Sequence, residues 1–302
     1  MLDEKPYVSI IIPTHNRPDL VVRAVASALA ASGSYIEVIV VEDGSDVAVQ
    51  ALEKFSNDSR LVITKNAGAR GAAATRNYGA RIATGSVLLF LDDDDELIGD
   101  YVKRVREIAS SQQVSWGFAR QMIRTVLETE THQKYEVNAN STGRVADMTV
   151  PFRRKIAALS SGFWIRRSLF LDLGGLCVEQ VVDEDTDLCC RLLGAGYEPW
   201  LENRYAVLLD RTSGVERLTT QADKNTNAEC YLRTFLRNIA SCEHIWGASA
   251  YLAFRAQRMI LRSGQIDMLN QLTRNVKKPW LRFGLSFKRV LFRWRRSQSR
   301  SA

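Results

Sequence analysis

Cysteines, histidines and long apolar runs are all scarce in this sequence of 302 residues. The five cysteines are an odd number and never show a Cys-x-x-Cys spacing, which argues against a disulfide framework or a structural zinc site. The longest apolar runs, at 8–12 and 87–91, are far shorter than the roughly 20 residues of a membrane-spanning helix. Residues 1–6 contain acids and no apolar signal-peptide segment, so we expect a cytoplasmic protein.

The positive charge of the chain is concentrated at its C-terminal end. Ten Lys or Arg residues and no acid follow Asp267, whereas the formal net charge of the whole chain is +7, so the remainder is net negative. Basicity that is confined to a tail does not indicate a general nucleic-acid-binding surface. We therefore do not expect nucleic acid as a partner.

Within this tail, basic residues alternate with tryptophan, phenylalanine and leucine over residues 277–296. Such a mixture is typical of an interfacial helix, whose aromatic side chains enter the headgroup region while Arg and Lys meet anionic lipid. We therefore expect a peripheral contact with the inner face of the cytoplasmic membrane. Two alternatives remain: a helix that packs on the rest of the protein and carries a disordered basic end, and an RNA contact through stacked aromatic and Arg side chains.

Short β-rich runs alternate with helical segments over about the first ninety residues. The runs are rich in Val, Ile and Leu and are bounded by turn residues, whereas the segments between them place apolar residues at spacings of three and four. This order predicts an α/β fold with a Rossmann-like, mostly parallel central sheet flanked by helices. The predicted strands are 8–12, 36–42, 61–64 and 86–91, and the predicted helices are 19–31, 47–55 and 72–83.

The pattern is weaker after residue 100. We expect a helix and irregular strands from 101 to 151, a strand at 162–165, a helix at 183–193 and further helices after residue 220. The predicted domains are a catalytic domain over 1–218, with a donor half at about 1–100 and an acceptor half at about 101–218, and a helical extension over 219–302.

Polar residues follow each of the four predicted N-terminal strands. Because ligands bind at the carboxyl ends of the strands in open α/β sheets, we expect these loops to form one site. Glycines in the third loop permit a tight turn before the next helix. The four loops are Pro13–Arg17, Glu42–Asp46, Asn66–Gly71 and Asp92–Glu96.

Four consecutive aspartates begin the last of these loops. Neighbouring carboxylates raise one another's pKa, so we expect a positive charge among them. In extended backbone Asp92 and Asp94 point to the same side, where both can ligate one hard cation such as Mg²⁺ or Mn²⁺. The alternative is a solvated acidic turn or a helix N-cap.

Five motifs occur in an order that characterises a known family: Pro13–Arg17, Glu42–Ser45, Thr75–Gly79, Phe90–Asp95 and Asp183–Asp185. Over residues 6–210 the chain resembles the family 2 glycosyltransferases. The resemblance implies the GT-A fold and an enzyme that transfers a hexose from a nucleotide diphosphate carrier, with a UDP-sugar expected. The implied acceptor is a hydroxyl of a glycan or of a lipid-linked molecule, in the synthesis of a surface polysaccharide or lipopolysaccharide.

The resemblance also implies roles on the donor side. Thr14 and Arg17 would lie along the nucleoside, and Asp43 would accept a hydrogen bond from the imide of the base. Arg76 would reach the base or the diphosphate, and Asp92 would contact the ribose. For isolated motifs, the turn preferences of Pro-Thr and Asp-Gly are the alternative explanation. The implied nucleotide-sugar-binding residues are Pro13, Thr14, Asn16, Arg17, Glu42, Asp43, Gly68, Arg76, Asp92 and Asp93.

A metal site and a catalytic base are implied in the same way. Asp94, together with Asp92, would ligate Mn²⁺ or Mg²⁺. Asp185 would take the proton of the acceptor hydroxyl during an inverting displacement, with Glu184 as a second candidate that positions the acceptor. We expect Asp94 and Asp185 to face one cleft. The alternative is that the acids near 185 only favour a helix N-terminus through its dipole.

One departure from the family concerns the stretch after the last core strand. Many relatives carry a metal-binding histidine there, whereas this chain has Asp210 and Arg211. Either Asp210 replaces the histidine or Arg211 holds the diphosphate.

Two other functions fit parts of the pattern. A nucleotidyltransferase would need a glycine-rich phosphate loop directly after the first strand, which Pro13–Arg17 does not supply. A non-catalytic nucleotide-binding module that docks on membranes would not need carboxylates at both Asp94 and Asp185. A glycosyltransferase therefore fits the sequence best.

Overall fold

The computed structural model describes residues 7–31, 35–44, 46–110, 114–127, 130–136, 142–144, 151–156, 161–211 and 222–286. The chain divides into two compact units. The first consists of Met1–Val150, Ala157–Val178 and Gly196–Val215, and the second of Pro151–Ile156, Glu179–Ala195 and Glu216–Ala302. The segment around residue 185, which the sequence analysis assigned to the domain that ends at 218, is thus grouped with the C-terminal helices.

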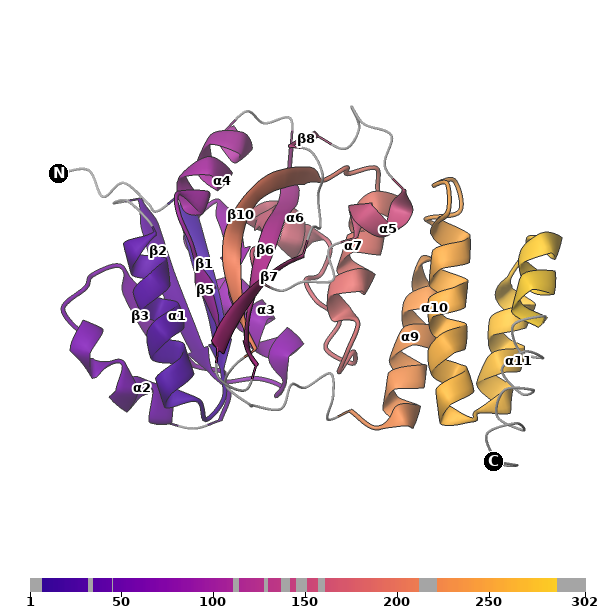
Figure 1. Cartoon of the computed structure of the whole chain (residues 1–302), viewed down its shortest axis with the longest axis horizontal. Helices are drawn as coiled ribbons and strands as arrows, with labels where there is room; N and C mark the ends of the chain where they lie inside the picture. The colour runs from indigo at the N-terminus through magenta and orange to yellow at the C-terminus, as the bar shows by residue number, and fades with distance from the viewer. Residues whose placement is uncertain are drawn as a thin grey trace. The chain divides into compact units, whose positions relative to one another are not determined.

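The first four strands form a parallel sheet in the order β3-β2-β1-β4. β1 (Val8–Thr14) pairs with β2 (Ile36–Glu42) and β4 (Val87–Phe90), and β2 pairs with β3 (Leu61–Lys65), close to the predicted positions. The chain builds outward from β1 to β3 and then crosses back to β4 on the other side of β1 (Figure 1). This reversal is a switch point, where doubly wound sheets bind ligands between the loops that follow the two strands.

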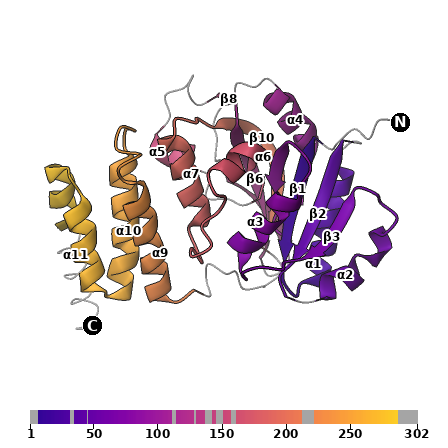
Figure 2. The ribbon, with the colours of Figure 1, turned by 180° about the vertical axis from the view of Figure 1, so that it is seen from behind.

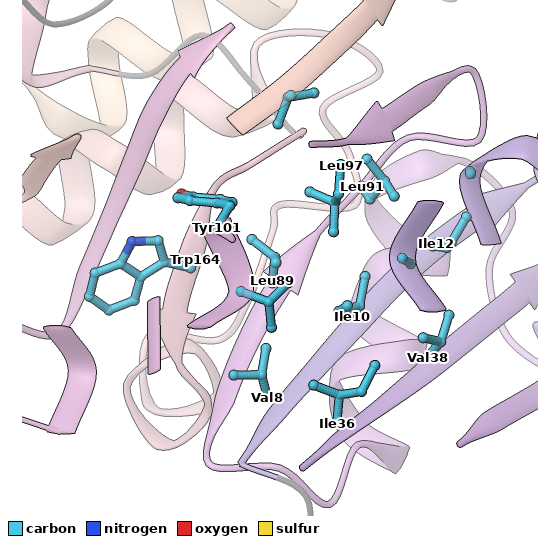
Figure 3. Close-up of a cluster of buried hydrophobic side chains, with 14 of the residues drawn as sticks. Val8, Ile10, Ile12, Ile36, Val38, Leu89, Leu91, Leu97, Tyr101 and Trp164 are labelled. Atoms are coloured by element: carbon cyan, nitrogen blue, oxygen red, sulfur yellow. The ribbon is translucent and has the colours of Figure 1, made fainter. Parts of the chain in front are cut away.

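Helices cover both faces of this sheet, as predicted. α1 (Pro18–Ala30), α2 (Val47–Ala51) and α4 (Tyr101–Ser110) bury apolar side chains on one face, in the cluster of Figure 3. A 3-10 turn, η1 (Glu53–Phe55), ends the segment that was predicted as a helix at 47–55.

The opposite face of the sheet packs against α3 (Ala72–Ile82) and α6 (Arg167–Asp172), and Figure 2 views the sheet from the α3 side. A Cβ atom on Gly79 would lie 2.6 Å from Cγ2 of Ile11, so only glycine lets α3 approach β1 this closely. The rings of Phe170 and Phe90 lie 5.5 Å apart and join α6 to β4. Successive side chains of a strand point to opposite faces of the sheet. Both helices therefore pack on the face opposite to the cluster of Figure 3.

The later strands of the first unit continue the sheet with mixed directions. β9 (Trp164–Arg166) is antiparallel to β4 and to β6 (Trp116–Leu127), and β10 (Trp200–Asp210) is parallel to β6. β7 (Glu130–Glu136) pairs with β6, and β8 (Gly143–Arg144) pairs with β10. The result is a curled α/β sheet with flanking helices, which confirms the predicted fold class.

One further strand, β5 (Asp95–Leu97), runs antiparallel to β10. The sequence analysis placed Asp95 in a loop, which is wrong, because Asp95 opens this strand and pairs with Leu209. A strand of three residues that depends on a partner more than a hundred positions away leaves no local periodicity to detect.

The second unit is helical. α9 (Lys224–Asn238), α10 (Ala248–Ser263) and α11 (Ile266–Asn275) are drawn in orange to yellow in Figure 1, and α5 (Phe152–Lys155) and α7 (Glu184–Gly194) belong to the same unit. Asp223 begins α9 by accepting hydrogen bonds from the backbone N–H groups of Asn225 and Thr226. The helices expected near 183–193 and after 220 are therefore present. None of the helices in the described part of the chain is long and apolar enough to cross a bilayer.

Candidate active site

The loops that follow β1 and β4 meet at the switch point of the first unit. The hydroxyl of Thr14 donates a hydrogen bond of 2.8 Å to Asp93, and the guanidinium of Arg17 donates one of 3.0 Å to the other oxygen of the same carboxylate. Burial raises the pKa of Asp93 to about 6, against the opposing effects of Arg17 and Thr14. Three of the predicted donor-site residues are thus brought together. The buried Asp93 links the loop after β4 to the loop after β1.

Three carboxylates of the aspartate run form a compact acidic cluster. One oxygen from each of Asp92, Asp94 and Asp95 lies within 4.8 Å of the others. The expected extended backbone is wrong, because the N–H of Asp95 donates 3.1 Å to the carbonyl of Asp92 and closes a turn. The turn still brings Asp92 and Asp94 together and adds Asp95. This all-oxygen donor set suits a hard cation such as Mg²⁺ or Mn²⁺.

The third acid of this cluster is fixed by neighbours in the first unit. The hydroxyl of Ser161 donates to one oxygen of Asp95, and the backbone N–H of Asp210 donates 3.3 Å to the other. Ser161 also accepts a hydrogen bond of 3.0 Å from the N–H of Asp92. Sequence reasoning missed both Asp95 and Ser161, because their roles depend on strands that are distant in sequence.

Asp210, which the sequence analysis considered as a replacement for the family histidine, is not among the three acids of this cluster in the described part of the chain. Its buried carboxylate pairs with the guanidinium of Arg23 at 2.6 Å and with that of Arg124 at 3.7 Å. Two guanidinium groups therefore lie near the same carboxylate oxygen of this candidate metal ligand. Arg211 is exposed next to it and donates its backbone N–H to the carbonyl of Arg124.

Asp43, the expected acceptor for the base, is held in one orientation by the loop after β3. The side-chain amide of Asn66 donates 3.2 Å to one oxygen, and the N–H of Gly71 donates 2.7 Å to the other. The N–H of Gly68 in turn donates 3.1 Å to the side chain of Asn66. The predicted residues Asp43 and Gly68 thus share one network, and Asn66, at its centre, is a residue that sequence reasoning did not single out.

Glu42 is a buried residue that supports the same region of the site. It is fully buried, and its two oxygens accept hydrogen bonds from the backbone N–H groups of Asn16, at 3.3 Å, and Ala48, at 3.2 Å. Asn16 itself has a left-handed backbone with φ of 54°, a conformation that asparagine tolerates better than most residues. Glu42 therefore connects the loops after β1 and β2. Pro13, another predicted residue, is half-exposed and pairs with Val41.

Two of the buried polar side chains of α3 connect it to neighbouring segments. Arg76 donates a hydrogen bond of 2.6 Å to Asp92, which brings this predicted residue to the edge of the acidic cluster. Asn77 forms two hydrogen bonds of 2.8 Å with the backbone N–H and carbonyl of Leu176. A Cβ on Gly175, which has φ of 69°, would lie 2.6 Å from Oδ1 of Asn77. Asn77 therefore fixes the double-glycine turn, a role that the sequence did not reveal.

The predicted catalytic residues lie in the second unit, in the first turn of α7. Asp185 and Glu184 are half-buried, and Asp185 accepts a hydrogen bond of 2.6 Å from the N–H of Thr186. Asp187 is buried and pairs with Arg191 at 2.9 Å, so it has a structural role. The approach of Asp185 to the acidic cluster of the first unit stays a prediction.

The sequence of the chain matches the model of one protein family, described as glycosyl transferase family 2, over residues 9–174. The chain belongs to this family. The matched range includes the loops after β1 to β4 and the acidic cluster, and it ends at the double-glycine turn before α7. As a family 2 glycosyltransferase the protein is an enzyme of sugar transfer with the GT-A fold.

Curated relatives support this assignment. An uncharacterised glycosyltransferase of Haemophilus influenzae is 29% identical over 75% of this chain and 78% of its own length. The Escherichia coli protein WfaP, named as a UDP-Glc:alpha-D-GlcNAc-diphosphoundecaprenol beta-1,3-glucosyltransferase, is 31% identical over 38% of this chain. This second alignment covers 46% of WfaP, so the chain matches less than half of that protein.

A solved structure shares the fold. Staphylococcus aureus TarS, residues 1–349, solved in complex with UDP-GlcNAc, has a TM-score of 0.61 and 17% sequence identity with this chain. The similarity covers 89% of this chain and 76% of the TarS structure. At this level of identity the likeness establishes the GT-A fold alone.

Proposed function

We propose that this enzyme transfers a sugar from a UDP-sugar to a hydroxyl of a glycan or lipid-linked acceptor in the assembly of a surface polysaccharide or lipopolysaccharide, with a divalent metal ion and with inversion. The observation that carries the proposal is the acidic cluster after β4, which Asp93 ties to the loop after β1. The names of WfaP and of the TarS complex support a UDP-sugar, and that of WfaP supports a lipid-linked acceptor.

On the donor side, the base meets the loop that Asp43 and Asn66 organise. Asp43 accepts a hydrogen bond from the imide N–H, and its orientation by Asn66 and Gly71 means that little freedom is lost when the base binds. Thr14 and Arg17 lie along the nucleoside, and Asp92 receives the ribose. These contacts bind and orient the donor before any bond changes.

The acidic cluster is the proposed metal site. Asp92 and Asp94 would hold Mn²⁺ or Mg²⁺, and Asp95 lies beside them with both oxygens already accepting hydrogen bonds. The ion would neutralise the charge that develops on the departing diphosphate. Arg76, already paired with Asp92, adds a second positive charge on the same side.

On the acceptor side, Asp185 is the proposed base. A sugar hydroxyl is a weak nucleophile, so the carboxylate takes its proton while the oxygen attacks the anomeric carbon. The new bond from carbon to oxygen forms as the bond from the anomeric carbon to the phosphate oxygen breaks, and UDP leaves with the electron pair. Attack from the face opposite the leaving group inverts the anomeric centre, and Glu184 positions the acceptor.

Incubation of the protein with UDP-glucose, UDP-galactose and UDP-N-acetylglucosamine tests this proposal. With Mn²⁺ or Mg²⁺ present, at least one donor should be hydrolysed slowly to UDP and free sugar, and EDTA should stop the reaction. NMR of the sugar before it mutarotates should show the anomer opposite to that of the donor. Release of UDP at the same rate with EDTA would contradict the metal dependence, and retention would contradict the displacement.

The C-terminal residues support a peripheral position on the inner face of the cytoplasmic membrane, which we propose as part of this function. Residues 279–286 are helical, and one side packs within the second unit through the buried Leu281 and Leu285. Trp280 and Phe283 point away from it and are 60% and 74% exposed. The buried leucines agree with the packed-helix alternative, and the two exposed aromatic side chains support the proposed interfacial contact. Residues 287–296 lie outside the described residues.

Vesicle sedimentation tests the membrane contact. We expect the protein to bind vesicles that contain phosphatidylglycerol and to bind phosphatidylcholine vesicles weakly, because the tail is basic. Replacing Trp280 and Phe283 by alanine should reduce binding several-fold, since the aromatic side chains enter the headgroup region. Trp246→Ala is the matched control, because Trp246 is 83% exposed in the same unit. Equal loss in the control would contradict the assignment to residues 280–283.

A further inference from the structure

The residue before α7 has a strained backbone. Asp183 has φ of 70° and ψ of 12°, in the left-handed region that non-glycine residues rarely adopt. Its side chain is almost fully buried, and burial raises its pKa to about 6, with Arg255 opposing the shift. Such a conformation persists only where the surrounding structure holds it. Asp185, the proposed base, lies two residues further on.

A single guanidinium, that of Arg255 on α10, holds both sides of this turn. One of its nitrogens lies 2.8 Å from a carboxylate oxygen of Asp183. Another donates a hydrogen bond of 2.7 Å to the hydroxyl of Thr186. The planar fork of arginine can make both contacts at once, which the single ammonium of lysine cannot do with the same geometry.

Arg255 is itself fixed by two aromatic rings of the second unit. The ring centroids of Tyr231 and Tyr251 lie 4.8 Å and 5.6 Å from its guanidinium carbon, and the hydroxyl of Tyr231 accepts a hydrogen bond of 3.4 Å. Asp183 raises the pKa of Arg255 above its usual range, so the guanidinium is charged at every working pH. Rings on two helices therefore set the position from which Arg255 reaches the turn.

We infer that Arg255 is a positioning residue for the catalytic turn of α7. Its contacts with Asp183 and Thr186 fix the backbone on both sides of Asp185. The N–H of Thr186 in turn orients the carboxylate of Asp185. Asp183, Thr186 and Asp187 are buried, whereas Asp185 and Glu184 remain half-buried. The inference rests on the proposed function only in its claim that the turn carries the base.

A role in stability alone accounts less well for these contacts. Burying an ion pair gains little over apolar side chains of similar volume, because both charges lose their hydration. What the pair does provide is a defined geometry at a strained turn, which apolar packing would not specify. A structural role and a positioning role also predict different responses to substitution.

Amide hydrogen exchange of the full-length protein separates the two roles without any substrate. In Arg255→Met, exchange of the amides at 183–187 should rise at least tenfold, while those of α9 and α10 keep wild-type protection. Arg255→Lys and Thr186→Val each keep part of the contacts with the turn. Amide exchange at 183–187 should therefore rise less in these variants than in Arg255→Met. Arg258→Met is the control, because Arg258 is exposed on the same helix. Unchanged exchange at 183–187, or an equal rise across α9 and α10, overturns the inference.

Kinetics test the consequence for catalysis. With the UDP-sugar that the wild type hydrolyses fastest, Arg255→Met should lower kcat at least tenfold and leave the Kd for UDP unchanged, with partial recovery in Arg255→Lys. Wild-type kcat in a variant whose turn has loosened overturns the link to Asp185. If Asp185→Asn keeps wild-type kcat, the proposed base has failed instead, and hydrogen exchange still decides whether Arg255 fixes the turn.

Discussion

Two acidic runs in this chain have similar sequences and different structures. In the first unit, Asp92, Asp94 and Asp95 place one oxygen each within 4.8 Å of the others. In the second unit the described acids near 185 form no such group, and Asp183 pairs with Arg255 and Asp187 with Arg191. Gathered carboxylates can share one cation, which we propose for the first run although Asp92 also pairs with Arg76. The arginine pairs of the second run instead hold Asp183 and Asp187 in place. The difference separates the proposed metal site from the turn that carries the proposed base, Asp185.

The two runs also have a feature in common. Each contains one buried aspartate whose pKa is raised to about 6 by burial and which contacts an arginine, Asp93 with Arg17 and Asp183 with Arg255. Asp93 ties its run to the loop after β1, and Asp183 ties its run to α10. One member of each run therefore anchors it, and the proposed metal ligands and the proposed base are neighbours of these anchors.

Removing one carboxylate from each run is the strongest test of the difference between the two runs. Asp185→Asn should lower the turnover of a UDP-sugar by roughly 10²–10⁴-fold with UDP affinity unchanged, since it removes general base catalysis. Asp94→Asn should instead abolish the effect of Mn²⁺ on UDP binding, because it removes a ligand from the cluster. Turnover and calorimetric titration with UDP, with and without Mn²⁺, measure both effects.

A matched control for both variants is Glu53→Gln, which changes an exposed acid on η1 and should alter neither quantity. If Asp185→Asn weakened UDP binding as much as Asp94→Asn does, the two runs would share one role and the comparison would fail.

The pH dependence of stability tests the anchor of the second run. The pKa of Asp183 is raised from 3.8 to about 6 in the folded protein, so the carboxyl binds its proton more tightly when folded. This contribution to the free energy of unfolding is present in full below pH 3.8 and is lost as the pH rises through about 6. From a shift of this size we expect a loss of up to about 3 kcal/mol.

Urea unfolding at several pH values between 4 and 7 measures this loss. Asp183→Asn should remove the part of this dependence that comes from Asp183, because asparagine does not titrate and tolerates the left-handed backbone. The part that comes from Asp93, whose pKa is also raised to about 6, should remain. Glu229→Gln, an exposed change on α9, should leave the dependence as in the wild type. The same slope in Asp183→Asn and in the wild type would contradict the assignment to Asp183.

The smallest expected effect concerns the anchor of the first run. Thr14→Val removes the hydroxyl that donates to the buried Asp93, which should cost about 1–3 kcal/mol of stability. Thr14→Ser keeps the hydroxyl and should restore most of it. Hydrogen exchange should rise around residues 92–95 and stay unchanged at 183–187. A rise at both places would show that the two anchors are not independent.

Much of the donor side could be predicted from the sequence. The strands at 8–14, 36–42, 61–65 and 87–90 and the helices between them follow from local periodicity, and the order of strands and loops places the polar clusters at one end of the sheet. The acidic run and the loop at Pro13–Arg17 were therefore expected to meet. The gathering of Asp92 with Asp94 was also expected, although the backbone there is a turn and not extended.

Other parts of the site depend on residues that are far apart in the chain. Ser161 reaches Asp95, Arg23 and Arg124 take the carboxylate of Asp210, and Asn77 fixes the turn at Gly175. None of these pairs produces a periodic pattern in the sequence, because each forms only when the folded chain brings distant segments together. The two arginine contacts of Asp210 could not be read from the sequence for the same reason.

By itself the sequence determined the alternation of strands and helices, the family and the positions of both acidic runs, because local spacing and side-chain type are written in consecutive residues. The tertiary structure alone decided which acids cluster and which are held apart. That choice depends on where distant arginines and backbone N–H groups lie, and on how strongly burial acts on each carboxylate.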